Sequence, residues 1–276
     1  MYSTCGPSVE DQPYYWSTGL RFPGQRRRGF HGEFPMAAVP SAAASPVPVS
    51  PGERWPPLES SPDVFNQLMW SLGVPEDVAE FHDVYSLDVD ALEMVPQPVL
   101  AVIFCFPDPT QDASNPSQHV LITGEKETLF FIKQIESLGN ACGTIALLHA
   151  VGNAYSEISL CKNSCLDMFV KSTSGMTSYE RAVFLEKDDD MARAHLLAAS
   201  AGDTKLSDDV EEHYICFVEC DGTLYELDGM KPGPINHGSS SAKSLLQDAV
   251  NIIKATMHNI PNSVNFNVIV LSRKAK

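Results

Sequence analysis

A cysteine stands just before a strongly apolar stretch, in the segment NACGTIALLHA at 140–150. The residues after Cys142 are apolar almost all round, which is typical of a helix in the middle of a core. With Asn140 as the N-cap residue, Cys142 falls in the first helical turn, where free N–H groups and the helix dipole favour a thiolate. The small neighbours Ala141 and Gly143 leave room for a substrate carbonyl. Cys142 is therefore a candidate nucleophile, and an inert buried cysteine is the alternative.

A nucleophilic cysteine needs a base, and the base needs a group that orients it. The segment EHYICFVECDGTLYELDG contains candidates for both. Asp221-Gly222 is a strong signal for a two-residue hairpin turn. Because side chains alternate between faces along a strand, that turn makes His213 and Asp228 diagonal neighbours, with Cα atoms about 7–8 Å apart. The spacing thus predicts a histidine and a carboxylate within reach of each other.

Other histidines compete for the role of base. His149 lies about 10 Å from Cys142 along the helix, too far for direct proton transfer, and is interpreted as a core or rim residue. His195 falls within a predicted helix, and His237 falls in a predicted turn. We find no carboxylate partner for any of the three that local geometry fixes, so His213 is preferred.

Two cysteine pairs with three residues between their members give a weak metal signal. They are Cys161 with Cys165, and Cys216 with Cys220. Zinc pairs usually sit in tighter knuckles, and two strand residues four apart are separated by about 13 Å. We therefore expect neither a metal nor a cofactor.

Helices and strands mix along the chain beyond residue 55. Hydrophobic period and capping signals predict helices over 60–73, 164–171, 177–200 and 241–259. The helix over 177–200 opens with a capping box, Thr177 and Glu180. Apolar and alternating runs predict strands over 99–106, 128–134 and 264–272, and polar segments predict loops over 107–118 and 201–212. This pattern indicates a mixed domain with a largely antiparallel sheet.

Composition bounds the class of protein. The chain has 276 residues, of which 43% are hydrophobic, and its net charge is −16. The charge disfavours nucleic acid and anionic membranes as partners, and the apolar runs are too short to span a bilayer. Seven irregularly placed cysteines argue against a disulfide framework and for a reducing compartment, the cytoplasm or the nucleus. Residues 1–52 are rich in Pro, Ala and Ser and are predicted to be a disordered leader.

Several motifs, in a consistent order, resemble the ubiquitin C-terminal hydrolases, the small cytosolic cysteine deubiquitinases. They include NACGTIALLHA, EEHYICFVECDGTLYELDG and KPGPINHG. The stretches RWPPLESSPDVFNQLMWSLG, FHDVYSLD and MVPQPVLAVIFCF also fit. The resemblance runs from Trp55 to Leu271 and is closest to the branch that contains isozymes L1 and L3. It implies a catalytic domain over 53–273.

The resemblance implies an α+β, papain-like cysteine protease fold, with a central, mainly antiparallel sheet flanked by helices and a knotted path. It also implies the roles of four residues. Cys142 is the nucleophile, His213 is the general base and acid, and Asp228 orients His213. Gln134 is the oxyanion-stabilising residue before the cysteine helix.

The same resemblance implies the substrate. Ubiquitin, or a ubiquitin-like protein, binds by its body and threads its tail into the cleft, with Asp83 and Leu58 as substrate-binding residues. The loop around 201–212 crosses over the site and limits the leaving group to small adducts or peptides. The expected protein is a monomeric thiol protease of the ubiquitin-dependent catabolic pathway.

One feature departs from the family pattern. The step from Gln134 to Cys142 is eight residues, whereas the family usually has six, as if two residues were inserted in IESLG. Losing an oxyanion donor typically lowers the rate about 10²–10³-fold. The alternative function is therefore a ubiquitin-binding or ubiquitin-stabilising protein with weak or no turnover.

Overall fold

A computed structural model describes residues 55–107, 120–121, 129–202, 212–260 and 263–274. The helices are α1 (Pro62–Leu72), α2 (Val89–Leu92), α3 (Cys142–Asn153), α4 (Cys165–Thr173), α5 (Ser178–Glu186), α6 (Asp189–Ala201) and α7 (Leu245–His258), with a 3₁₀ turn, η2 (Glu136–Leu138). The predicted leader, most of the predicted 107–118 loop and most of the predicted crossing loop lie outside the described residues. None of the described helices is long and apolar enough to cross a membrane.

A seven-stranded sheet forms the centre of the fold. Its strands are β1 (Ala79–Asp83), β2 (Val99–Pro107), β3 (Val120–Leu121), β4 (Glu212–Cys220), β5 (Thr223–Leu227), β6 (Ile235–Ser239) and β7 (Asn267–Arg273). They lie in the order β1-β7-β2-β4-β5-β6-β3, and every neighbouring pair is antiparallel. The predicted strands over 99–106 and 264–272 are confirmed as β2 and β7.

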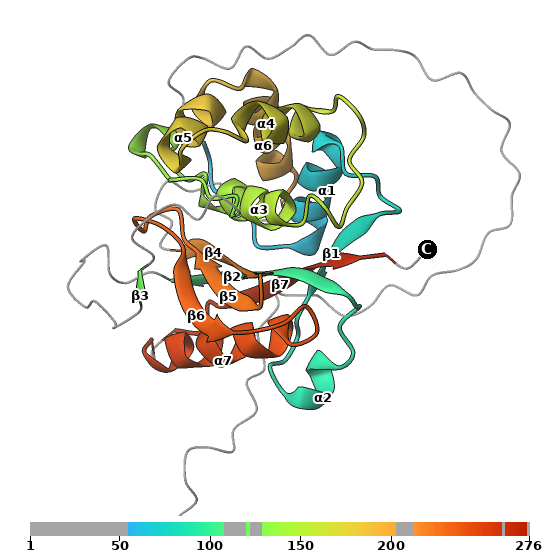
Figure 1. Ribbon diagram of the computed structural model, residues 1–276, viewed down its shortest axis with the longest axis vertical. Helices are drawn as coiled ribbons and strands as arrows, with labels where there is room; N and C mark the ends of the chain where they lie inside the picture. The colour runs from blue at the N-terminus through green and yellow to red at the C-terminus, as the bar shows by residue number, and fades with distance from the viewer. Residues whose placement is uncertain (1–54, 108–119, 122–128, 203–211, 261–262, 275–276) are drawn as a thin grey trace, which may run out of the picture.

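Helices cover both faces of the sheet, so the molecule has two cores. Figure 1 shows α1 and α3–α6 on one side and α7 on the other. Alternation along β4 feeds both cores, with Tyr214 and Cys216 in the first and Ile215 and Phe217 in the second. The first core places α3, the helix that begins at Cys142, directly against β4.

The predicted hairpin is confirmed. Strands β4 and β5 pair from Cys216 with Leu227 down to Cys220 with Thr223. The two turn residues have positive φ angles, 51° at Asp221 and 77° at Gly222. A two-residue type I′ turn requires such angles at both central positions. This turn fixes the register, and the register determines which side chains meet at the far end of the hairpin.

The helix predicted over 177–200 is wrong in its length. The capping box is present, because Glu180 N–H donates to Thr177 Oγ1 at 3.3 Å and Thr177 N–H donates to Glu180 Oε2 at 2.8 Å. However, the helix ends at Glu186, and α6 begins at Asp189. Asp188 accepts a hydrogen bond from Met191 N–H at 3.0 Å and so acts as a new N-cap. A side chain that can cap thus interrupts an otherwise helical pattern.

The strand predicted over 128–134 is also wrong. Residues 129–134 have no regular secondary structure and join no strand of the sheet. Apolar residues with a strand-like pattern are present because the segment is buried against α3. Its backbone groups bond instead to side chains and loops, including Asn153 and Arg181.

Candidate active site

Cys142 is the first residue of α3, and its side chain is half-buried. The predicted N-cap at Asn140 is off by one residue, since Ala141 is the N-cap and offers no side-chain hydrogen bond. Asn140 instead donates its backbone N–H to the Trp55 carbonyl, at 3.0 Å. The first intrahelical bond runs from Ile145 N–H to the Ala141 carbonyl at 2.9 Å. The N–H groups of the first turn, starting at Cys142, therefore precede the helical ladder.

Gly143 packs closely against Leu58 and Tyr214, on the side where a Cβ atom would lie. A Cβ there would lie 3.2 Å from Leu58 Cβ and 3.5 Å from the Tyr214 ring. Leu58 is 4% exposed, and its carbonyl accepts a hydrogen bond from the Tyr214 hydroxyl at 2.9 Å. The expectation that Gly143 leaves room for a substrate carbonyl is therefore wrong for this direction, because Leu58 fills that space.

His213 and Asp228 meet at the end of the hairpin. His213 Nε2 lies 2.8 Å from Asp228 Oδ1, and the same oxygen accepts a hydrogen bond from Met230 N–H at 2.9 Å. Both side chains are buried. Asp228 follows β5 directly, so the confirmed hairpin register brings the carboxylate to the histidine.

The charge state of His213 depends on these neighbours. Burial disfavours the imidazolium, but the hydrogen bond with Asp228 and the interaction with the Cys142 side chain outweigh burial and raise the pKa of His213 to about 10. For Asp228, burial opposes the charged form, yet its hydrogen bond with His213 keeps the pKa of the carboxyl below its ordinary value. The charged imidazolium of His213 thus interacts with the Asp228 carboxylate and with the Cys142 side chain.

Three other cysteines are poor nucleophiles. Burial raises the pKa of Cys105 to about 12 and also raises that of Cys216. Burial, together with the charges of Asp188 and Asp190, raises the pKa of Cys165 to about 12. A thiol with a raised pKa carries little thiolate at neutral pH.

Gln134 is fixed at both its backbone and its side chain. Its N–H donates to the Gly229 carbonyl at 2.8 Å, one residue beyond Asp228. Its side-chain Nε2 donates to the Gly139 carbonyl at 3.2 Å, and its buried Oε1 has no hydrogen-bond partner among the described residues. Gly139 has φ 60° and ψ −127°, a conformation that favours glycine.

The long connection between Gln134 and Cys142 is compact. Its middle residues form the 3₁₀ turn η2, in which Leu138 is fully buried. After that turn, Gly139 bridges to Trp55. The extra length is therefore taken up in a turn that returns to Gln134.

The remaining candidate histidines have structural partners. His237 lies in β6 rather than in a turn, and its Nε2 lies 2.7 Å from Glu226 Oε2. The expectation that it lacks a fixed carboxylate partner is wrong, because β5 and β6 pair side by side. His195 is in α6, as predicted, and joins Thr144 Oγ1 to the Pro56 carbonyl, each at 2.7 Å.

The burial of His195 is expected to make the protein less stable in acid. Burial lowers its pKa to about 4, so between about pH 6.5 and 4 the unfolded chain takes up a proton that the folded chain does not. The contribution is present above pH 6.5 and is lost as the pH falls towards 4. We expect His195→Gln to reduce the difference in unfolding free energy between pH 7 and pH 4.5 by about 2 kcal/mol. Urea denaturation at both pH values measures this, and an unchanged difference contradicts it.

Asp83, a predicted substrate-binding residue, lies at the end of β1. Burial raises the pKa of its carboxyl, whereas a hydrogen bond with Asn267 of β7 opposes that rise. Leu58, the other such residue, is buried beside the first turn of α3. Contact of either residue with a substrate stays a prediction.

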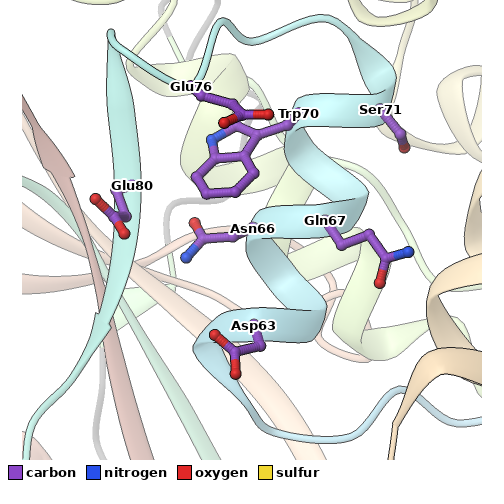
Figure 2. Close-up of a pocket in the computed structure, with 7 residues that line it drawn as sticks. All are labelled: Asp63, Asn66, Gln67, Trp70, Ser71, Glu76 and Glu80. Atoms are coloured by element: carbon purple, nitrogen blue, oxygen red, sulfur yellow. The ribbon is translucent and has the colours of Figure 1, made fainter. Parts of the chain in front are cut away.

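A second surface feature is separate from these groups. Figure 2 shows a pocket between α1 and β1, with Trp70 directed from the helix towards the strand. The Trp70 indole N–H donates to the Ala79 carbonyl at 3.1 Å, and Lys274 lies over the ring and pairs with Glu80 at 2.7 Å. None of the predicted site residues lines this pocket. Within the described ranges, no three His, Cys, Asp or Glu side chains gather as a metal site.

Comparison with known proteins decides the family. Residues 55–258 match the family model described as ubiquitin carboxyl-terminal hydrolase, family 1. The chain belongs to this family. Its members include ubiquitin carboxyl-terminal hydrolase 3 of Arabidopsis thaliana, 50% identical over 82% of this chain and 97% of the relative. Ubiquitin carboxyl-terminal hydrolase isozyme L1 of Monodelphis domestica is 35% identical over 79% of this chain and 98% of the relative.

Solved structures share the fold of this hydrolase. The catalytic domain of Trichinella spiralis UCH37, bound to ubiquitin vinyl methyl ester, superposes with a TM-score of 0.65 at 20% identity, covering 80% of this chain and 96% of that one. The predicted α+β fold class is confirmed. The family is one of cysteine-type hydrolases, so the predicted enzyme class is confirmed as well.

Proposed function

We propose that this chain hydrolyses bonds at the C-terminus of ubiquitin, with Cys142, His213 and Asp228 as a catalytic triad. The observation that carries the proposal is the buried His213–Asp228 hydrogen bond of 2.8 Å, with Cys142 at a helix N-terminus as the second group acting on the imidazole. Membership in the family supports ubiquitin as the substrate.

The reaction begins from a thiolate and an imidazolium. The sulfur of Cys142 attacks the terminal carbonyl carbon of ubiquitin, and the carbonyl oxygen becomes an oxyanion. His213 gives its proton to the leaving amine or thiol, and the bond to that group breaks to leave a thioester. His213 then takes a proton from water as the water oxygen attacks the thioester. The bond to sulfur breaks, which releases ubiquitin and restores the Cys142 thiolate beside the protonated His213. Asp228 keeps the imidazole oriented and stabilises its charged form.

The oxyanion receives hydrogen bonds from the Cys142 N–H and the Gln134 amide. The fixed position of Gln134 supports this role, because its backbone is bonded to Gly229 and its amide nitrogen to Gly139. The amide nitrogen carries a second hydrogen for the oxyanion. The alternative, ubiquitin binding with weak turnover, rested on the longer connection between Gln134 and Cys142. The compact η2 turn takes up that extra length, so the alternative has less support.

The leaving groups are small adducts or peptides, and the cytoplasm or the nucleus is the compartment, with a monomer as the active form. A net charge of −16 suits a basic partner surface. A related fold bound to ubiquitin vinyl methyl ester supports ubiquitin as the partner. Asp83 and Leu58 are the proposed contacts for its body and tail.

A fluorogenic amide on the C-terminus of ubiquitin tests the proposal. We expect saturable release of the fluorophore by the full chain, at least about 10²-fold faster than from a short peptide amide with the same last residues, because remote binding energy contributes to catalysis. We also expect ubiquitin vinyl methyl ester to form a covalent adduct that peptide mass mapping assigns to Cys142.

The possible results separate the candidate functions. Equal cleavage of the short peptide indicates an unrelated thiol hydrolase. Tight ubiquitin binding without turnover or adduct indicates the binding protein. Either result overturns the proposal.

A further inference from the structure

The histidine on the nucleophile helix, His149, is fully buried and neutral. His149 lies about two turns after Cys142 and is 0% exposed. Its Nε2 lies 2.9 Å from the Ile132 backbone nitrogen and 3.2 Å from the Ile132 carbonyl oxygen. With its proton on Nδ1 the ring accepts from that N–H, and with its proton on Nε2 it donates to that carbonyl, so either neutral tautomer binds the Ile132 backbone. Burial lowers the pKa of His149 to about 4, so the ring is uncharged at neutral pH.

The ring is held in place from several sides. It stacks on Phe131, with centroids 5.1 Å apart and planes 14° apart. The Leu227 carbonyl, one residue before Asp228, is an acceptor that acts on the ring. By strict geometry, however, Nδ1 has no hydrogen-bond partner in the described part of the chain, so the bond to Ile132 is the stronger of the two. The stacking on Phe131 and the contact with Ile132 together fix the position of His149 Nε2.

Asn153 repeats the contact one turn later on the same helix. Its Oδ1 accepts from Phe130 N–H and its Nδ2 donates to the Phe130 carbonyl, both at 2.9 Å. Nδ2 also donates to the His149 carbonyl at 2.8 Å, which locks the side chain. His149 and Asn153 of α3 thus pair with the backbone of Ile132 and Phe130, two alternate residues of the segment 129–134, as a neighbouring strand would.

The segment that they hold leads directly to Gln134. It has no strand neighbour in the described structure, so its backbone depends on these side chains and on a few outside contacts. Arg181 donates to the Phe131 carbonyl at 3.0 Å, and Lys133 N–H donates to the Ser178 carbonyl at 3.1 Å. Among these contacts, only those from α3 tie the segment to the element that carries the nucleophile.

We propose that His149 is a positioning residue, which sets the distance between Cys142 and the Gln134 amide by binding the Ile132 backbone from the nucleophile helix. This inference rests on the proposed function. An oxyanion donor must lie about 3 Å from the developing charge, and small misplacements lower rates strongly. A rigid link between the two elements provides that precision where sheet pairing does not.

A pair of substitutions separates this role from simple core filling. In His149→Gln, the side-chain amide reaches the place of Nε2 and can pair with the Ile132 backbone as donor or acceptor. In His149→Leu, the core stays filled but the Ile132 backbone loses its partner. The matched control is Ile253→Ala, which weakens the second core behind the sheet. Gln134→Ala gives the size of a complete loss of the donor.

We expect His149→Leu to lower kcat for the ubiquitin amide about 10–100-fold, less than Gln134→Ala, with KM within about threefold. His149→Gln restores kcat to within about threefold, and Ile253→Ala leaves it unchanged despite lower stability. Alkylation of Cys142 by iodoacetamide needs a thiolate but no oxyanion donor. Its rate is therefore unchanged in His149→Leu, His149→Gln and Ile253→Ala. Exchange of the Ile132 amide hydrogen is faster in His149→Leu than in Ile253→Ala.

The outcomes distinguish this inference from the proposed function. A wild-type chain that does not cleave the ubiquitin amide overturns both. A wild-type chain that cleaves it, together with a folded His149→Leu of equal kcat, overturns only the inference. The inference is also overturned if His149→Gln is as slow as His149→Leu, or if iodoacetamide alkylation falls in parallel with kcat.

Discussion

Replacing Cys142 by alanine is expected to abolish hydrolysis of a ubiquitin C-terminal amide, with a loss of about 10⁶-fold in kcat, the order seen when a triad nucleophile is removed. Cys105, which interacts with Cys142, does not take its place, because burial raises the pKa of Cys105 to about 12. Cys142→Ser is expected to be nearly as inactive, since a hydroxyl does not ionise at neutral pH beside His213. Initial rates over several enzyme concentrations measure both losses.

Binding and folding should survive the change to alanine. Cys142 is half-buried at a helix start, where alanine is well tolerated, so we expect an unfolding midpoint close to that of the wild type. Calorimetric titration with ubiquitin should give a dissociation constant within a few-fold of the wild type. Cys161→Ala, at an exposed cysteine, is the matched control and should keep full activity. Activity that persists in Cys142→Ala contradicts the assignment of the nucleophile.

The hairpin could be predicted because its information is local. Asp221 and Gly222 have the positive φ angles that a two-residue turn demands, and the turn sets the pairing of every residue behind it. Period-two alternation then brings His213 to Asp228. The pair could therefore be placed before any comparison, whereas its contact with Cys142 depends on how α3 packs against β4.

Other parts depend on tertiary contacts that sequence periodicity does not contain. The start of α3 shifts by one residue because Asn140 N–H bonds to Trp55, which is far away in the chain. The stretch over 128–134 has the composition of a strand, yet side chains such as Asn153 replace strand pairing there. His237 meets Glu226 only because β6 pairs with β5 through an irregular register.

Gln134 illustrates the limit most clearly. No local pattern marks it, and only the resemblance to the family singled it out. The structure adds that its amide bonds to Gly139, inside the very connection whose extra length made its role doubtful. The η2 turn and the orientation of the Gln134 side chain together set the position of its amide. Neither can be predicted from the spacing of residues alone.

Replacing Asp228 by asparagine is expected to lower kcat/KM about 10²–10⁴-fold. The hydrogen bond of 2.8 Å to His213 can survive through the amide oxygen, but the negative charge that stabilises the imidazolium is lost. If the amide nitrogen faces the ring instead, the wrong tautomer results. Both effects deplete the ion pair with Cys142.

The pH profile separates this electrostatic role from a packing role. Because the pKa of His213 is raised to about 10, the imidazolium persists until the pH rises through that value, and the alkaline limb of wild-type kcat/KM should lie near it. In Asp228→Asn the limb should move down, towards the ordinary histidine value of about 6.5. Measuring kcat/KM from pH 6 to 10.5 shows the shift.

A second carboxylate–histidine pair, between β5 and β6, provides the control. Glu226→Gln removes the charge that faces His237 at 2.7 Å, at a position only two residues from Asp228 in the chain. Because the His237 ring lies 6.1 Å from Phe217 of the second core, on the face of the sheet opposite α3, we expect the rate and the alkaline limb of Glu226→Gln to match the wild type. An Asp228→Asn protein that behaves like Glu226→Gln, with an unmoved limb and kcat/KM within threefold, removes Asp228 from the triad.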